Sequence, residues 1–165
     1  MIKPEELLNF IKERRSIREF QDKDIPDSEI EMILEAGRWT PSASNRQPWE
    51  FIVIRDKEII KKLGGVQRQK FWVHAPVHIA IIGKIKKNPN WYLIDTTLAS
   101  MNMILMAWAL KIGTCWVGAM DKEKASEILG LTEDEFLLTI LPLGYIKGDI
   151  PKSYRTIMKR IKREI

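Results

Sequence analysis

One long apolar segment constrains the fold of this chain more than any other feature. Residues 96–110 form the longest apolar run, interrupted at Asn102. The run is shorter than the roughly 18 residues expected of a membrane-spanning helix, so we expect no membrane segment. The sequence predicts instead a long helix that is capped by Asn88 and ends near Lys111. Because residues 98–110 are apolar on nearly every side, this helix is expected at the centre of the fold or at a subunit interface.

Helical and strand-like segments alternate along the rest of the chain. Helices are predicted over residues 4–13, 27–37, 57–63 and 121–129, and strands over 49–55, 77–83 and 137–146. Ser28 and Glu31 have the spacing of a capping box, and Pro142 predicts an edge position or an irregularity in the last strand. The pattern predicts one mixed α and β domain over residues 1–165. Because three strands are few for a sheet, a further strand from a partner chain is expected.

The positive charge is concentrated at the end of the chain. The protein has 165 residues and a formal net charge of +5, and residues 147–165, with seven basic and two acidic side chains, account for all of it. A neutral body with a basic tail argues against a nucleic-acid-coated surface, although a tail that binds nucleic acid stays an alternative. The single cysteine, Cys115, and the lack of an apolar signal after Met1 predict a cytoplasmic protein.

Several common chemistries are missing from the sequence. Two histidines and one cysteine cannot supply a zinc site of the usual spacing, so no metal is expected. The sequence contains no G-x-G-x-x-G after a strand, no G-x-x-x-x-G-K-[ST] and no G-x-S-x-G. His78 lies in an apolar strand and is expected to be a hydrogen-bonded core residue. Cys115 is expected to be a small buried hydrophobe rather than a nucleophile.

Three other stretches indicate a ligand. Residues 14–18 read Arg-Arg-Ser-Ile-Arg, and such clustered guanidinium groups repel one another unless an anion such as phosphate neutralises them. A solvated basic turn is the alternative. Residues 41–49 offer hydroxyls and amides without carboxylates, which suits a heteroaromatic ligand. In residues 113–120, Gly118 and Ala119 allow backbone N–H groups to approach a ligand closely.

Taken together, these stretches resemble the nitroreductase family of FMN-dependent oxidoreductases. The matching sequences are R-R-S-I-R-E-F at 14–20, P-S-A-S-N-R-Q-P-W-E-F at 41–51, A-P at 75–76 and G-T-C-W-V-G at 113–118. The resemblance spans residues 10 to about 155. The pairing of R-R-S-x-R with P-S-x-x-N-x-Q-P-W is specific, whereas either half alone is not.

The resemblance implies a fold and a reaction. The implied fold is α+β, a three-layer α-β-α sandwich with a mainly antiparallel central sheet, in an intertwined homodimer with C-terminal strand exchange. The implied enzyme transfers a hydride from NAD(P)H through N5 of FMN to a small acceptor such as a nitroaromatic or a quinone, in ping-pong order. No catalytic side chain is required, because the cofactor carries the chemistry.

The resemblance also implies which residues bind FMN at its charged ends. The residues expected at the phosphate and ribityl chain are Arg14, Arg15 and Ser16, with Lys152 or Arg155 as a further phosphate ligand. Arg18 would reach the pyrimidine edge of the isoalloxazine. A cation there stabilises the reduced flavin, which is anionic.

Further contacts are implied from two other segments and from the partner. The residues expected to complete the site of the opposite subunit are Pro41, Ser42, Ala43, Ser44, Asn45 and Gln47. The backbone N–H of Gly118 or Ala119, next to Val117, would face flavin N5. Arg68, with Gln69 beside it, stands where family members often have an asparagine that binds the pyrimidine.

The chain also departs from the family pattern. Many members have an acidic residue followed by glycine where this chain has Gly118-Ala119, and the chain lacks much of the helical excursion that lines the substrate channel. The acceptor therefore does not follow from the resemblance. Reductive dehalogenation, flavin-dependent dehydrogenation and a flavin carrier or sensor without turnover remain alternatives.

Overall fold

A four-stranded antiparallel sheet forms the centre of the molecule. The computed structural model describes residues 2–156, and the strands lie in the order β1-β2-β4-β3. Their bounds are Trp49–Ile54 for β1, Val77–Lys84 for β2, Ile112–Thr114 for β3 and Glu135–Tyr145 for β4. The inner strand β2 is apolar along most of its length because both of its faces are covered, and seven of its eight residues are buried.

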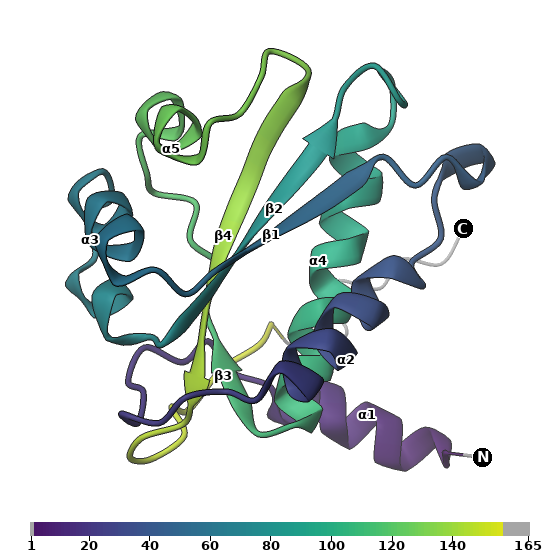
Figure 1. Ribbon diagram of the computed structural model, residues 1–165. Helices are drawn as coiled ribbons and strands as arrows, with labels where there is room; N and C mark the ends of the chain where they lie inside the picture. Colours follow the sequence, from purple (N-terminus) through teal and green to yellow (C-terminus); the bar gives the residue numbers. More distant parts are fainter. Residues whose placement is uncertain (1, 157–165) are drawn as a thin grey trace.

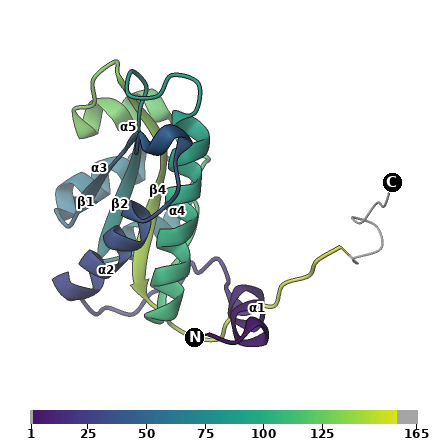
Figure 2. The same cartoon turned by 90° about the vertical axis from the view of Figure 1, so that its right-hand side faces the viewer.

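Helices cover both faces of this sheet, which gives three layers (Figures 1 and 2). One face is covered by α2 (Asp27–Arg38) and α4 (Tyr92–Ala109), and the other by α3 (Lys57–Gly65), α5 (Lys122–Leu129) and the short 3₁₀ helix η2 (Lys70–His74). Alternate residues of β2 point to opposite faces, so Ile81 joins the core that contains Met103 of α4, and Ile82 joins the core that contains Trp72 of η2. The predicted three-layer α+β fold is confirmed.

The long apolar helix starts later than the sequence predicts. Asn88 does not cap α4 with its side chain. Its carbonyl oxygen accepts hydrogen bonds from the N–H groups of Trp91 and Tyr92 at 3.1 and 2.8 Å, and its side-chain amide donates to Asp95. Residues 88–91 therefore form a turn, and the helix begins at Tyr92.

One face of α4 is buried, and residues 2–156 leave the opposite face uncovered. Ala99, Met103 and Ala107 are fully buried, whereas Leu98 and Met101 are 45% and 39% exposed. The helix therefore packs in the core on one side and presents an apolar stripe on the other.

The predicted capping box at the start of α2 is wrong. The helix begins at Asp27, and the carbonyl oxygen of Pro26 accepts from the N–H groups of Glu29 and Ile30 at 3.1 and 3.3 Å. Ser28 thus lies inside the first turn rather than before it, where its hydroxyl cannot act as the cap.

The prediction that Pro142 lies at a sheet edge is also wrong. β4 lies between β2 and β3, and Pro142 is paired with His78 of β2. On its other side the ladder with β3 ends at the pair of Thr114 and Leu143, so Pro142 lies just past the last residue of that short strand. The irregularity of β4 occurs elsewhere, where the register with β2 shifts between Ile81 and Ile82.

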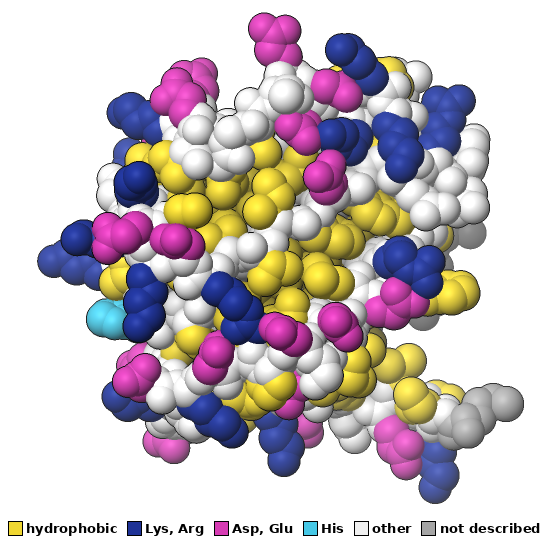
Figure 3. Space-filling model, viewed as in Figure 1, with side chains coloured by type: hydrophobic (Ala, Val, Ile, Leu, Met, Phe, Trp, Pro, Cys, Tyr) yellow, Lys and Arg dark blue, Asp and Glu magenta, His cyan; other side chains and the backbone are white. Residues whose placement is uncertain are grey.

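The first helix and the C-terminal segment extend from the body (Figure 2). α1 (Pro4–Glu13) has the predicted bounds but contains no buried residue, and Leu7, Leu8 and Ile11 on its apolar face are exposed. Hydrophobic side chains also gather across the side of the molecule where β1 forms the edge of the sheet (Figure 3). Among the described residues, no helix has both the length and the apolar character needed to cross a bilayer.

Some expectations concern residues outside the described part of the chain. The predicted C-terminal strand exchange and the basic cluster at residues 159–163 both involve residues 157–165, which are not described. That residues 1–165 form a single domain likewise stays a prediction.

Candidate functional site

The basic segment is attached to the β3 end of the sheet. The N–H of Ile17 donates to the carbonyl oxygen of Thr114 at 2.8 Å, and Ser16 pairs with Thr114 in parallel orientation. Ile17 and Phe20 are buried, and each lies against a glycine of the sheet, Gly113 and Gly144. A side chain at either glycine would collide with this segment, so the two glycines allow the basic residues to lie directly over β3 and β4.

Arg15 and Arg155 lie close enough to Arg14, at the β3 end of the sheet, for their positive charges to repel that of Arg14. Burial lowers the pKa of Arg14 below the usual arginine range, and the positive charges of Arg155 and Arg15 lower it further. In residues 2–156, neither Arg14 nor Arg155 makes a salt bridge with a carboxylate. A bound anion would offset this repulsion.

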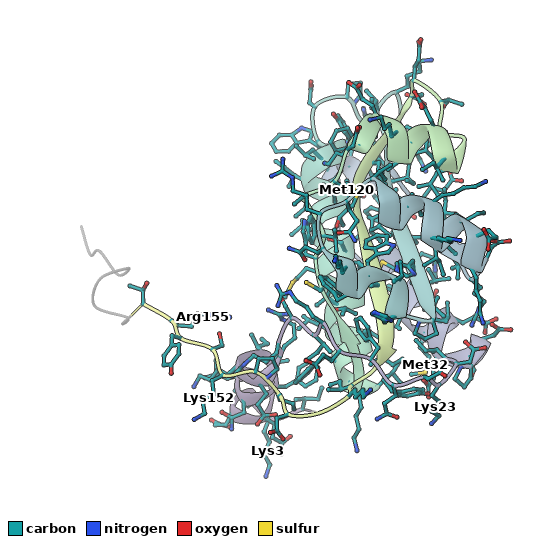
Figure 4. The ribbon with its side chains drawn as sticks, turned by 90° about the vertical axis from the view of Figure 1, so that its left-hand side faces the viewer. Lys3, Lys23, Met32, Met120, Lys152 and Arg155 are labelled. Carbon is teal, nitrogen blue, oxygen red and sulfur yellow. The ribbon has the colours of Figure 1, made fainter. Side chains whose placement is uncertain are left out.

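The C-terminal segment returns to the basic turn through Arg15. The Arg15 guanidinium donates to the carbonyl oxygens of Pro151 at 2.9 Å, Lys12 at 2.5 Å and Arg14 at 2.9 Å. Lys152 and Arg155 follow on an extended stretch that runs past α1 (Figure 4). Two segments that are more than 130 residues apart in the sequence thus bring their cations together.

Cys115 lies beneath the basic segment and is poorly suited to act as a nucleophile. The residue is 3% exposed, and burial raises the pKa of its thiol. The positive charges of Arg18 and Arg14 and a hydrogen bond from Ser16 oppose this increase only in part. The raised pKa favours the neutral thiol over the nucleophilic thiolate. The predicted burial of Cys115 is confirmed.

The next residues present backbone at the surface. Val117 is buried, is bridged to Ile140 of β4, and its carbonyl oxygen accepts from the hydroxyl of Thr139 at 2.9 Å. The exposed residues Gly118 and Ala119 follow directly. Val117, fixed against β4, thus positions two small residues whose backbone a ligand can reach.

Arg68 faces the same surface as Ala119. Gln67 pairs with Met120, and the N–H of Asp121 donates to the carbonyl oxygen of Val66 at 2.8 Å. The cleft between these segments has a volume of about 480 Å³, and its lining residues are Val66, Arg68, Ala119, Met120 and Asp121. The structure therefore places Arg68 in one cleft with a residue predicted to face flavin N5. Met120 marks this cleft in Figure 4.

A larger cleft of about 1170 Å³ lies between residues 18–24, α3 and η2. Arg18 is the only predicted site residue in its lining, which contains both basic and acidic side chains. Arg18 also lies 5.8 Å from the ring centroid of Phe71 in η2. The larger volume therefore does not coincide with the predicted site.

The loop of residues 41–47 lies far from the other predicted residues. The N–H of Ala43 contacts Asp95 near the start of α4, whereas the basic segment contacts Thr114, which follows the end of α4. About 20 Å of helix separates the two ends of α4 at these contacts. One chain therefore does not bring the loop and the basic segment together (Figure 1).

Sequence reasoning missed the residues that hold this loop. The side-chain amide of Asn102 donates to the hydroxyl of Thr40 at 2.7 Å, and Asp95 is buried although it carries an acidic group. Asp95 is the only charged residue of α4 and Asn102 interrupts its apolar run, and these were the signals available in the sequence.

Comparison with known proteins identifies the family. A family model named Nitroreductase matches residues 11–74 and 65–145. The "Putative NADH dehydrogenase/NAD(P)H nitroreductase" of Archaeoglobus fulgidus is 37% identical over 153 residues, which cover 88% of each chain. This chain belongs to the nitroreductase family.

Two further similarities bear on chemistry. The solved structure titled FMN-dependent nitroreductase from Clostridium difficile R20291 has a TM-score of 0.86 at 26% identity, and covers 95% of this chain and 98% of its own. The iodotyrosine dehalogenase 1 homolog of Caenorhabditis elegans is 27% identical over 179 residues, which cover 85% of this chain and 54% of that protein. The predicted enzyme class, an NAD(P)H-dependent oxidoreductase of the nitroreductase family with FMN as cofactor, is confirmed.

The residues at the β3 end fit a phosphate-bearing cofactor of this family. Arg14 and Arg155 are cations without a carboxylate partner in the described chain, and the hydroxyl of Ser16 contacts Cys115, on which the charge of Arg14 also acts. Guanidinium and hydroxyl donors are suited to phosphate oxygens. Across residues 2–156, no three histidine, cysteine, aspartate or glutamate side chains cluster as metal ligands.

Proposed function

We propose that this protein is a homodimeric oxidoreductase that takes a hydride from NAD(P)H and passes two electrons to a small acceptor such as a nitroaromatic or a quinone, in ping-pong order. The observation that carries the proposal is the arginine cluster at Arg14 and Arg155, which has no acidic partner in the described chain. Arg14 also acts on Cys115, three residues before the exposed backbone of Gly118.

In this proposal each predicted residue binds one part of FMN. The residues that hold the phosphate and ribityl chain are Arg14, Arg15, Ser16 and either Lys152 or Arg155. Arg18 lies at the pyrimidine edge, and its charge stabilises negative charge that develops there. When bound, FMN supplies the redox chemistry by accepting a hydride at N5 and passing two electrons to the acceptor.

The backbone of Gly118 or Ala119 donates a hydrogen bond toward N5. Val117, fixed by Thr139, sets the position of these two residues. Arg68 and Gln69 contact the pyrimidine from the opposite side of the small cleft. No side chain of this chain is required as a nucleophile or a base.

The proposed site is shared between two chains. The loop of residues 41–47 from the partner would complete it, because α4 holds the two halves of the site apart within one chain. The exposed apolar stripe of α4 and the exposed apolar face of α1 support a dimer, since such surfaces are normally covered. β1 pairs only with β2 in the described residues, so its outer edge is open to a strand from the partner's C-terminus.

Absorbance spectra test the proposal. The purified protein is expected to retain FMN, or to bind it on addition, and to show flavin absorbance after desalting. Anaerobic NAD(P)H is expected to bleach this absorbance, and a nitroaromatic or a quinone to restore it. Protein that stays colourless after FMN addition and desalting would refute the proposal. Bound FMN that NAD(P)H fails to bleach would favour a carrier or a sensor.

Reductive dehalogenation is the second candidate. The similarity to the iodotyrosine dehalogenase 1 homolog favours it over other flavin reactions. Steady-state oxidation of NAD(P)H with nitro, quinone and halogenated aromatic acceptors separates the two candidates. Turnover that occurs only with the halogenated acceptor, with halide release, would replace the first proposal by the second.

A further inference from the structure

The loop at residues 40–48 is held at both ends and at its centre by polar side chains of α4. The side-chain amide of Asn102 donates to the Thr40 hydroxyl at 2.7 Å. The N–H of Ala43 donates to Oδ1 of Asp95 at 3.2 Å. At the far end, the hydroxyl of Thr96 donates to the carbonyl oxygen of Pro48 at 3.4 Å.

Asp95 is the central contact of this set. The residue is 3% exposed, and its second oxygen, Oδ2, accepts from the side-chain amide of Asn88 at 3.0 Å. Asn88 is equally buried. A carboxylate is costly to bury unless both oxygens find donors, so this arrangement requires the loop and the turn at Asn88 to stay in place.

The loop needs such support because its backbone is strained. Ser44, Asn45 and Gln47 have φ angles of 54°, 53° and 49°, in the left-handed region that residues other than glycine seldom adopt. Within the loop, the Ser42 hydroxyl oxygen accepts from the N–H of Gln47 at 2.9 Å. Strained conformations of this kind persist only where surrounding contacts define them.

The same helix carries the apolar stripe that is left uncovered. Between Asp95 and Asn102 lie Leu98 and Met101, which are exposed. Residues three and four positions apart share a helix face, so the line of loop contacts borders this stripe. A second chain that covered the stripe would therefore contact the loop in the conformation that the side chains of α4 hold.

We propose that Asp95 is a positioning residue, which, together with Asn102, fixes the loop of residues 41–47 before FMN binds to the neighbouring chain. The inference rests on the proposed function, in which this loop completes the partner's flavin site. If the loop is competent in only a fraction of molecules, the apparent affinity for FMN falls by that fraction. Loss of Asp95 thus weakens FMN binding without removing any atom from the site.

Amide hydrogen exchange on the apoprotein tests the positioning directly. Asp95→Ala is expected to raise the exchange rate of the amides of residues 42–47, and Asn102→Ala to raise it at the start of the loop. Thr97→Ala is the matched control. Thr97 lies on the same helix, and its hydroxyl donates to the Leu93 carbonyl at 2.6 Å rather than to the loop. We expect the amides of residues 42–47 to exchange at the same rate in Thr97→Ala as in the wild type.

FMN titration followed by fluorescence gives the second measurement. Asp95→Ala is expected to raise the dissociation constant of FMN roughly tenfold, as for a lost hydrogen bond to a charged group, and Thr97→Ala to change it by less than about twofold. The kcat of the FMN-saturated enzyme is expected to change far less than this affinity.

A swap of the buried pair distinguishes positioning from general destabilisation. In the Asp95→Asn/Asn88→Asp double variant, the amide at position 95 can still accept from Ala43 while it donates to the carboxylate at position 88. Asn88→Asp alone places two carboxylates against each other, and it is expected to speed loop exchange and weaken FMN binding. The double variant is expected to restore both the slow exchange and the FMN affinity.

Each outcome has one meaning. Loop exchange in Asp95→Ala that equals that of Thr97→Ala would overturn the inference, as would a double variant no better than Asn88→Asp. If the wild type binds no FMN, the proposed function fails, whereas the exchange measurement on the apoprotein still decides whether Asp95 holds the loop.

Discussion

Gly113 of β3 lies directly against Ile17 of the basic segment. A Cβ atom placed on Gly113 would lie 2.6 Å from Cβ of Ile17, closer than two carbon atoms that are not bonded to each other can approach. The contact matters for function because of the neighbours of Ile17 in the sequence. Arg14, Arg15 and Ser16, which we assign to the phosphate, precede it, and Arg18 follows it.

Gly113→Ala is therefore expected to displace the basic segment. We expect a loss of about 1–3 kcal/mol in the free energy of unfolding, the usual cost of overpacking, together with weaker FMN binding. Urea denaturation and FMN titration measure the two effects. Gly65→Ala is the control, because a Cβ there has no neighbour within 4 Å. Equal stability of the two variants would show that the close approach is not required.

Arg14 is expected to recognise the phosphate rather than the flavin ring. Arg14→Gln should weaken FMN binding by roughly tenfold or more, because a charge-assisted hydrogen bond is lost, and should leave riboflavin binding nearly unchanged. Isothermal titration with both ligands makes the comparison. Arg38→Gln is the control, since Arg38 is an exposed arginine on α2 that pairs with Glu35. A parallel loss for riboflavin would contradict the assignment.

Mixed dimers test whether each site uses two chains. Arg14→Gln impairs the basic segment and Asn45→Ala impairs the loop, so each homodimer should bind FMN poorly. In a heterodimer of the two variants, one site receives both intact segments and the other receives both impaired ones. Recovery of one FMN per purified heterodimer is expected. No recovery would show that both segments of a site come from one chain.

His78 makes stability depend on pH. Its side chain is fully buried, Nε2 lies 3.1 Å from the Trp72 carbonyl oxygen, and burial lowers its pKa to about 3. Below about pH 6.5 the unfolded chain binds a proton that the folded chain excludes, so stability falls as the pH decreases toward 3. The slope from this residue is at most about 1.4 kcal/mol per pH unit.

Urea denaturation between pH 7.5 and 5.5 measures this dependence. His78→Phe is expected to flatten it, although loss of the hydrogen bond lowers stability at every pH. His74→Gln serves as the control because His74 is exposed. The pH range stops at 5.5 so that Glu135 does not affect the slope. The pKa of Glu135 is lowered to about 2, chiefly by Lys84, so the stability that this carboxylate contributes is lost only as the pH falls below about 4.5. A wild-type slope that survives in His78→Phe would contradict the assignment.

Local patterns predicted most of the elements and the composition of the site. The apolar runs and helical spacings located α1, β1, β2 and α5 within a few residues, because side-chain periodicity reports which face is buried. They failed at Asn88 and Pro142, where the outcome depends on a partner elsewhere in the chain, and at Ser28, where the helix begins at Asp27, too early for a Ser28 cap. Asn88 bonds to Asp95 instead of capping, and Pro142 is tolerated inside the sheet only because β3 ends beside it.

The sequence by itself determined the residue types that can hold a phosphate and a flavin, since charge and hydrogen-bonding capacity belong to each residue. Only the tertiary structure decided which of them meet. It joined the basic segment to Arg155 and placed Arg68 beside Ala119, but it kept the loop of residues 41–47 at the opposite end of α4. The physical reason is that a rigid helix fixes the distance between its ends, which no local pattern of polar residues reveals.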